Sequence, residues 1–117
     1  KYNIAKIYNK SILEEITEKP SDLTFTVGVL IHINPDYRNL VYDNLVSKSK
    51  RYIVIVEYYN PSPVDIIYRG HKDKLFKRDF AGELIEEYGL NLVDYGFFYK
   101  RDKLTPQDDL TWFLLEK

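Results

Sequence analysis

The strongest fold signal in the chain is the segment from Leu23 to Tyr58, which reads LTFTVGVLI (23–31), HINPDYRNLVYDNLVSKSKR (32–51) and YIVIVEY (52–58). The first and last pieces are apolar and β-branched, which predicts strands. The middle piece contains a helix start, because Asn34 can cap free amides and Pro35 suits the first helical position. A strand, a helix and a second strand in this order favour a right-handed crossover between parallel strands. The segment therefore predicts an α/β fold.

Two short amphipathic helices are predicted to cover the sheet. The first begins after Asn34. Its apolar residues recur with helical spacing and are Tyr37, Leu40, Val41 and Leu45. The second helix starts at Asp79, a good capping residue, and ends at Gly89, which suits the left-handed conformation that closes helices.

The C-terminal third predicts two further strands, residues 92–99 and 110–115. The polar segment 100–109 between them has no room for a helix, so the two strands should form an antiparallel hairpin and the sheet should be mixed. Residues 5–8 are a candidate for one more short strand. Residues 60–78 predict a long irregular loop, of a kind that is often functional or mobile.

The composition fits one globular domain over residues 1–117, since a chain of 117 residues with 44% hydrophobic residues can form a single core. The 17 basic and 18 acidic residues give a net charge of −1, which removes the positive field expected of a general nucleic-acid-binding protein. The apolar runs are too short to span a membrane, and no N-terminal signal pattern is present. We therefore expect a cytoplasmic protein that has neither nucleic acid nor a membrane as partner.

Missing residue types and motifs exclude several kinds of site. Without cysteine there is no disulfide, thiolate zinc site or cysteine nucleophile. His32 and His71 have no metal-ligand spacing to carboxylates, so no metal site is expected. No glycine-rich phosphate loop or familiar hydrolase motif occurs either. The chain begins at Lys1 and has no methionine, from which we expect it to be part of a longer protein.

Polar residues follow the two predicted parallel strands, at the sheet edge where open α/β sheets bind ligands. His32 is either a general base for a substrate hydroxyl or amine, or a histidine bonded to a nearby carbonyl. Glu57 ends an apolar strand, where burial raises a carboxyl pKa unless a cation pairs with the group. Glu57 is therefore a second candidate base, and the alternative is a buried ion pair with Arg69 or Arg78.

Other residues near this edge are candidates for ligand contacts. Gly28 would let a flat ligand or another backbone approach, and a bulge or tight packing is the alternative. Tyr58 and Tyr59 suit sugar or base faces, although such rings more often pack in a core. The segment 68–78 concentrates positive charge that suits phosphate or carboxylate groups, and a solvated basic loop is the alternative. Its candidate residues are Arg69, His71, Lys72 and Arg78.

Several stretches resemble one known family. DLTFTVGVLIHINP (22–35) is similar to the fourth-strand motif of class I S-adenosylmethionine-dependent methyltransferases. EYYNPSP (57–63), YRGHKDKLFKRDFAG (68–82) and PQDDLTWFLL (106–115) extend the similarity to nearly the whole chain. Together these stretches resemble the pseudaminic acid biosynthesis-associated methylases, a bacterial group within that superfamily.

The resemblance implies a Rossmann-like sheet of order 3-2-1-4-5-7-6 with strand 7 antiparallel, in a three-layer αβα domain when complete. The four main predicted strands fall on strands 4, 5, 6 and 7, and residues 5–8 fall on strand 3. Ser11 and Ile12 would then lie where such enzymes contact the adenine ring, and Ser11 stands where the family favours an acidic residue. Thr26, Val27 and Gly28 would be further cofactor contacts at the end of strand 4.

The resemblance also implies what this chain lacks. Strands 1 and 2, the glycine-rich cofactor loop and the acidic ligand of the ribose belong to the N-terminal half of the domain. Residues 1–117 therefore resemble the C-terminal half, which we expect to be inactive alone. The unpaired edge of strand 4 should favour either a homo-oligomer or association with the missing half.

Two hypotheses about function follow. The first is methyl transfer from S-adenosylmethionine, without a metal, to a small acceptor of the sugar type, such as a nucleotide-linked sugar. His32 and Glu57 would be the candidate proton acceptors, and Tyr58 would orient the acceptor. The residues that would bind the acceptor are Tyr59, Arg69, His71, Lys72 and Arg78. The second hypothesis is a non-catalytic α/β module for ligand binding or oligomerisation.

Overall fold

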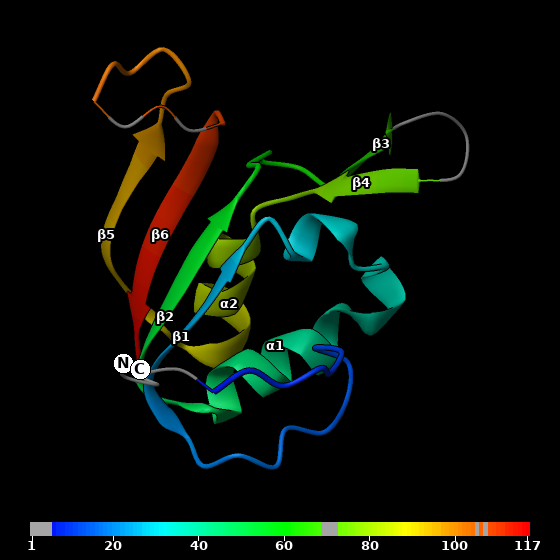
Figure 1. Ribbon diagram of the computed structural model, residues 1–117, viewed down its shortest axis with the longest axis vertical. Coiled ribbons are helices and arrows are strands. Elements are labelled where there is room, and N and C mark those ends of the chain that lie inside the picture. Colours follow the sequence, from blue (N-terminus) through cyan, green and yellow to red (C-terminus); the bar gives the residue numbers. More distant parts are fainter. Residues whose placement is uncertain (1–5, 69–72, 105, 107) are drawn as a thin grey trace.

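The computed structural model describes residues 6–68, 73–104, 106 and 108–117. Its main sheet has the strand order β1-β2-β6-β5 (Figure 1). The strands are β1 (Ser21–Val27), β2 (Ser49–Glu57), β5 (Asn91–Phe98) and β6 (Leu110–Glu116). β1 and β2 are parallel, whereas β6 is antiparallel to both β2 and β5. The predicted α/β fold with a mixed sheet is confirmed, and so is the predicted order of these four strands.

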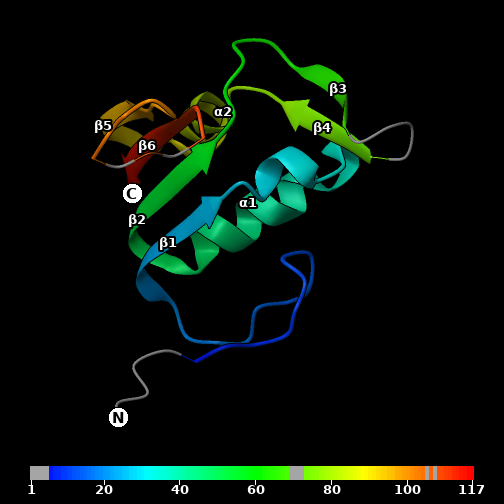
Figure 2. The same ribbon diagram turned by 45° about the horizontal axis from the view of Figure 1, so that its top comes forward.

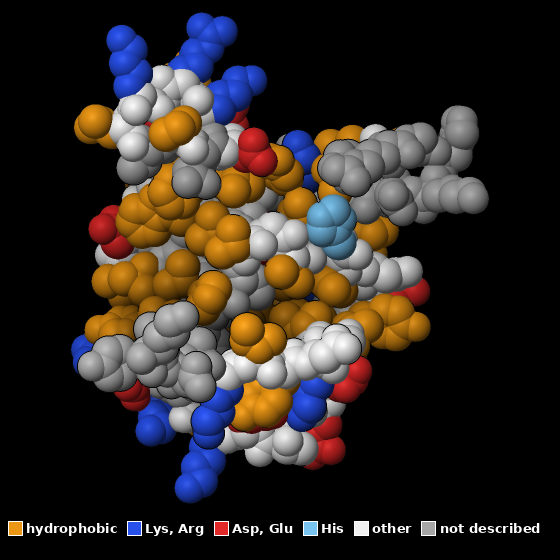
Figure 3. Space-filling view, viewed as in Figure 1, with side chains coloured by type: hydrophobic (Ala, Val, Ile, Leu, Met, Phe, Trp, Pro, Cys, Tyr) orange, Lys and Arg blue, Asp and Glu red, His pale blue; other side chains and the backbone are white. Residues whose placement is uncertain are grey.

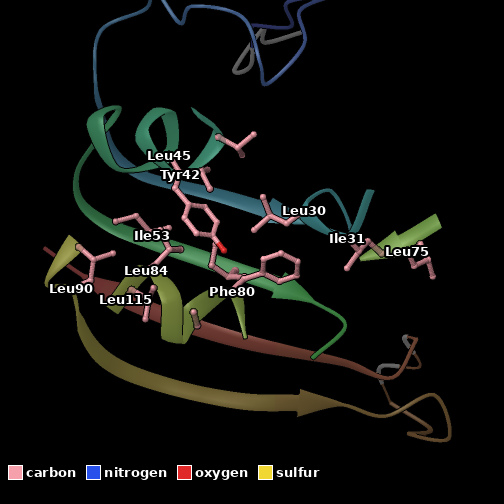
Figure 4. Close-up of a cluster of buried hydrophobic side chains, with 13 residues drawn as sticks. Leu30, Ile31, Tyr42, Leu45, Ile53, Leu75, Phe80, Leu84, Leu90 and Leu115 are labelled. Carbon is pink, nitrogen blue, oxygen red and sulfur yellow. The ribbon is translucent and has the colours of Figure 1, made fainter. Parts of the chain in front are cut away.

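Both helices, α1 (Arg38–Ser47) and α2 (Phe80–Tyr88), cover the same face of the main sheet (Figure 1). Figure 4 shows apolar side chains of the two helices meeting those of β2 and β6. The side chains with 0% exposure in this core are Val41, Tyr42, Ile53, Leu84 and Leu115. The sheet and the helices therefore share one continuous core on this side.

Local sequence signals set the ends of the helices. Asp79 caps α2 by accepting a hydrogen bond from the Gly82 amide at 2.9 Å, and Gly89 ends α2 with a left-handed φ of 66°. The side chain of Asn34 also accepts an amide hydrogen bond, at 2.9 Å, but it begins the 3₁₀ turn η2 (Pro35–Tyr37). The helix α1 therefore begins after this turn, later than the sequence predicted.

The first strand ends earlier than predicted. β1 stops at Val27 because Gly28 takes a left-handed φ of 63°, and the chain continues into the 3₁₀ turn η1 (Leu30–His32) rather than extending to Ile31. Residues 6–8 form no strand, and residue 5 lies outside the described part of the chain. The prediction of a strand over 5–8 is wrong for the described residues, which have no neighbouring strand to pair with.

The segment 60–78 is not an irregular loop. It contains β3 (Val64–Tyr68) and β4 (Asp73–Lys77), which form an antiparallel hairpin that projects from the main sheet (Figure 1 and Figure 2). Leu75 on β4 is buried in the core, and β4 packs against η1. Strands of five residues are too short to give a clear alternating pattern, so the sequence analysis missed them.

The other face of the main sheet has no helix over it within the described residues, and we call it the open face. Apolar side chains of three neighbouring strands form it. They are Leu23, Phe25 and Val27 of β1, Tyr52, Val54 and Val56 of β2, and Trp112 and Leu114 of β6. Figure 3 shows hydrophobic side chains gathered over the sheet. β1 lies at the edge of this sheet, as predicted for strand 4 without its neighbour.

Candidate functional site

The carboxyl ends of β1 and β2 lie side by side, because these strands are parallel. The Gly28 amide donates to the Val56 carbonyl at 2.9 Å, after which the chain leaves the sheet. A shallow hollow of about 10 Å³, open to solvent, lies at this edge, and its walls include Glu57, Tyr58, Tyr59 and Arg78. The structure therefore brings four of the predicted site residues together where open α/β sheets bind ligands.

Glu57 is the last residue of β2 and is only 2% exposed to solvent. Its carboxylate oxygens accept hydrogen bonds from the amides of Val29, at 3.2 Å, and Ile31, at 3.3 Å. Burial raises the pKa of this carboxyl group above its ordinary value, and the amide hydrogen bonds oppose the shift. Arg78 does not provide the ion pair considered for Glu57, because its Nε donates to Glu83 at 2.7 Å.

The predicted cofactor contacts at the end of β1 face different directions. Thr26 is buried on the helix-covered side, and its Oγ1 has no hydrogen-bond partner among the described residues. Val27 is 53% exposed on the open face. Gly28 has open space where a Cβ atom would stand. Its left-handed φ, and not tight packing, is therefore what requires a glycine there.

The other predicted cofactor contacts, Ser11 and Ile12, lie beside α1. The Ile12 carbonyl accepts a hydrogen bond from Asn44 Nδ2 at 2.8 Å, and Ser11 Oγ accepts one from the Leu13 amide at 3.1 Å. Ile12 also packs against the core as a half-buried residue. These contacts tie the N-terminal segment to α1, and no hydrogen bond among the described residues joins it to Gly28.

The remaining candidates stand around the same edge. His32 closes η1 and is exposed. Figure 3 shows hydrophobic side chains over much of this face of the molecule. The Lys77 ammonium lies 4.9 Å from the ring centroid of the half-buried Tyr58, within the range of a cation–π contact. The Tyr59 ring centroid is 6.1 Å from that of Phe113. Both tyrosines therefore pack against neighbours while they line the hollow.

A cluster centred on Glu83 was not singled out in the sequence. The Glu83 carboxylate accepts from Arg38 at 3.1 Å, from Arg78 at 2.7 Å and from the Tyr42 hydroxyl at 2.6 Å. Burial and the negative charge of Glu83 raise the pKa of Tyr42. The spacing of Arg38 and Tyr42 gave a usable signal, because residues four apart lie on one face of a helix. The cluster ties α1 to α2.

A second shallow hollow, also of about 10 Å³, adjoins this cluster. Its walls are Leu30, Ile33, Pro35, Arg38, Val41, Tyr42, Phe76, Arg78 and Phe80. Arg78 and Phe80 line both hollows, so the segment that enters α2 connects them. The walls are mostly apolar, and the side chains of Arg38 and Arg78, which pair with Glu83, stand among them.

Three of the predicted acceptor-binding residues, Arg69, His71 and Lys72, lie outside the described residues. The described ranges hold no group of three or more His, Cys, Asp or Glu residues that could bind a metal ion. Within the same ranges, no helix has both the length and the apolar character needed to cross a membrane.

No protein-family model matches the sequence, and no curated protein matches it either. The fold does match solved structures. The 1,6-didemethyltoxoflavin-N1-methyltransferase of Burkholderia thailandensis, crystallised with 1,6-didemethyltoxoflavin and S-adenosylhomocysteine, aligns over 94% of this chain and 49% of its own, with a TM-score of 0.71 and 12% identity. The magnesium protoporphyrin IX methyltransferase of Synechocystis PCC 6803, solved with bound S-adenosylmethionine, aligns over 94% and 44%, with a TM-score of 0.62 and 10% identity.

A third solved structure is an S-adenosylmethionine-dependent methyltransferase of Methanosarcina mazei, which aligns over 92% of this chain and 65% of its own, with a TM-score of 0.66 and 9% identity. These similarities show a Rossmann-like fold of the class I methyltransferase type. The chain spans about half the length of the first two of these structures, 49% and 44%.

Proposed function

We propose that this chain is the C-terminal part of an S-adenosylmethionine-dependent methyltransferase. The observation that carries the proposal is the fold match, which covers 94% of this chain but only 49% of the similar 1,6-didemethyltoxoflavin-N1-methyltransferase. The sheet edge supports it, because Glu57, Tyr58, Tyr59 and Arg78 line one hollow at the carboxyl end of β2, a strand that runs parallel to β1.

The residues present fit only a small part of a cofactor site. Gly28 leaves open space at the strand end, and the buried Thr26 lies close to it on the same strand. The sequence has no glycine-rich loop that could cradle a nucleotide. We therefore propose that Thr26, Val27 and Gly28 supply one wall, and that a second polypeptide segment supplies the rest of the cofactor site.

S-adenosylmethionine supplies a methyl group that its positively charged sulfur already activates. The tasks left to this chain are to orient the acceptor, to exclude water and to take up a proton from the attacking hydroxyl or amine. His32 is the candidate proton acceptor, since it is exposed at the sheet edge. Tyr58 would orient the acceptor from the wall of the hollow at this edge.

The acceptor that we propose is a small molecule of the sugar type, linked to pseudaminic acid biosynthesis by the resemblance of residues 68–82 to that family. Tyr59 and Arg78 would contact it from the walls of the hollow. Arg69, His71 and Lys72, which precede Arg78 in the sequence, would add positive charge. Such charges suit a nucleotide-linked sugar, whose phosphates are anionic. The protein would act in the cytoplasm.

The test uses the protein expressed from its complete reading frame, S-adenosylmethionine and candidate sugar nucleotides, with methyl transfer followed by mass spectrometry. His32→Asn should fold normally, keep cofactor affinity and lose roughly 10² to 10⁴ in kcat. Tyr37→Phe, an exposed position in the neighbouring turn, is the matched control and should keep full activity. A rate of His32→Asn per folded molecule within about threefold of the wild type would contradict the role of His32.

A non-catalytic module is the second candidate, and the open face favours it. A large exposed apolar surface next to an unpaired strand edge is typical of an interaction site. In this case the chain would associate with itself or with a partner through β1, and it would not transfer methyl groups. Methyl transfer by the protein from its complete reading frame separates the two candidates.

A further inference from the structure

The polypeptide leaves the sheet between β1 and η1, and the amides of Val29 and Ile31 there donate to a side chain, Glu57. The last ladder bond joins the Gly28 amide to the Val56 carbonyl at 2.9 Å, and the left-handed φ of Gly28 then turns the chain away. The amides of Val29 and Ile31 therefore need other acceptors, because unpaired amides are costly where water is excluded. Ile31 is 3% exposed, which shows that this part of the turn is buried.

Glu57 supplies both acceptors from the neighbouring strand. Its Oε2 accepts from the Val29 amide at 3.2 Å and its Oε1 from the Ile31 amide at 3.3 Å. Its own backbone pairs with Thr111 on β6, so the carboxylate is anchored to the end of a central strand. One buried side chain thus connects the end of β2 to both sides of the turn at the end of β1.

We propose that Glu57 is a positioning residue, which holds the turn at residues 29–31 and thereby sets the place of the His32 imidazole. The inference rests on the proposed role of His32 in methyl transfer. The His32 amide donates to the Val29 carbonyl at 3.0 Å, and the Val29 amide donates to Glu57. Val29 therefore links Glu57 at one end of the turn to His32 at the other. With both oxygens occupied and 2% exposure, Glu57 holds His32 in place and does not itself take the substrate proton.

The chemistry of the carboxylate explains why other side chains cannot replace it. Two amides need two acceptor oxygens, and glutamine offers only one, since its NH₂ group would face the second amide. Aspartate has two oxygens but is one methylene shorter. Ionised carboxylates also accept stronger hydrogen bonds than neutral amides do. Glu57→Gln therefore loosens the turn while it keeps the size and shape of the side chain.

The first arm of the test measures amide hydrogen exchange by NMR on this chain, which needs no substrate. In Glu57→Gln, the amides of Val29 and Ile31 should exchange at least tenfold faster relative to the amides of β2. The matched control is Ile53→Val, a conservative change at a fully buried position of the same strand. The control should speed exchange of the whole core alike, and should leave the ratio between turn and β2 unchanged. An unchanged ratio in Glu57→Gln would overturn the proposal.

The second arm measures methyl transfer by the protein from its complete reading frame. Glu57→Gln should lower kcat per folded molecule by at least tenfold with less than a twofold change in the KM of the cofactor, whereas Ile53→Val should change neither. A merely structural glutamate would lower the melting temperature and leave the normalised kcat as it is, which would overturn the proposal. If the wild type transfers no methyl group, the proposed function fails, and the exchange arm alone decides whether Glu57 holds the turn that places His32.

Discussion

The two faces of the main sheet are built from alternate residues of the same strands, yet one face is buried under the helices and the other leaves large apolar side chains exposed. On the helix-covered side, Ile53 and Leu115 are completely buried. On the open face, Phe25 of β1 is 64% exposed. β1 is the clearest case, because its polar residues Thr24 and Thr26 point toward the helices and its large apolar residues point outward.

Large apolar residues on the exposed side of β1 are typical of a strand in a sheet that is covered on both faces. Strands buried on both faces are apolar on both sides, as in the parallel sheets of α/β proteins. Exposed apolar patches of this kind mark contact surfaces. The chain spans 49% of the similar 1,6-didemethyltoxoflavin-N1-methyltransferase structure. The helix-covered side therefore holds the core, whereas the open face leaves large apolar side chains exposed.

The largest expected effect compares truncations on the two faces. Leu84→Ala removes a side chain with 0% exposure and should lower the free energy of unfolding by about 2–5 kcal/mol. Phe25→Ala, on the open face, should cost less than about 1 kcal/mol in the monomer, because little of its surface is buried on folding. Urea unfolding at low protein concentration measures both. Equal losses would show that the open face is already covered in solution.

A smaller effect is expected at Gly28, where β1 leaves the sheet. Gly28→Ala should cost about 1–2 kcal/mol, because its φ of 63° disfavours a Cβ although no atom lies within 4 Å of the place that Cβ would take. Gly28→Asn should cost clearly less, since asparagine tolerates the left-handed conformation. The same unfolding measurement compares the two variants. If alanine and asparagine cost the same, the backbone conformation is not what selects glycine.

A tyrosine on the helix-covered side should make the free energy of unfolding depend on pH in the alkaline range. Burial and Glu83 raise the pKa of Tyr42, so above a pH of about 10 the unfolded state releases a proton that the folded state keeps. The contribution of Tyr42 is complete below this pH, and it falls by about 1.4 kcal/mol per pH unit above it. Tyr42→Phe should therefore unfold with a shallower alkaline slope. Identical slopes in both proteins would contradict the assignment.

The smallest effect on stability is expected for polar substitutions on the open face. Phe25→Thr should change the free energy of unfolding by less than about 1 kcal/mol but should reduce self-association through the β1 edge. Sedimentation velocity over a range of concentrations measures the association. The exposed Asn39→Ala on α1 is the control and should leave it unchanged. Self-association that survives Phe25→Thr unchanged would place the contact elsewhere.

Sequence patterns predicted the main sheet and its helices because these elements carry clear periodicity and capping residues. The hairpin of β3 and β4 was missed, since its strands have only five residues each. The end of β1 was placed too late because VGVLI (27–31) is apolar throughout, and periodicity alone does not show the left-handed φ of Gly28.

The candidate site could be predicted in part for a physical reason. Residues at the carboxyl ends of parallel strands lie at one edge of the sheet, where Glu57, Tyr58 and Tyr59 follow one another along the chain and line one hollow. The partners of Glu57 could not be predicted, since they are backbone amides of a turn whose shape depends on Gly28. The Glu83 cluster depends on how α1 and α2 pack, which no local pattern specifies.

The most direct test is a calorimetric titration of S-adenosylmethionine into the 117-residue chain and, in parallel, into the protein from its complete reading frame. If the open face and the β1 edge await the half that carries the cofactor loop, the 117-residue chain should bind the cofactor weakly or not at all. The complete protein should then bind it with a micromolar Kd or tighter. Micromolar binding by the 117-residue chain alone would contradict the proposal that a second polypeptide segment supplies most of the cofactor site.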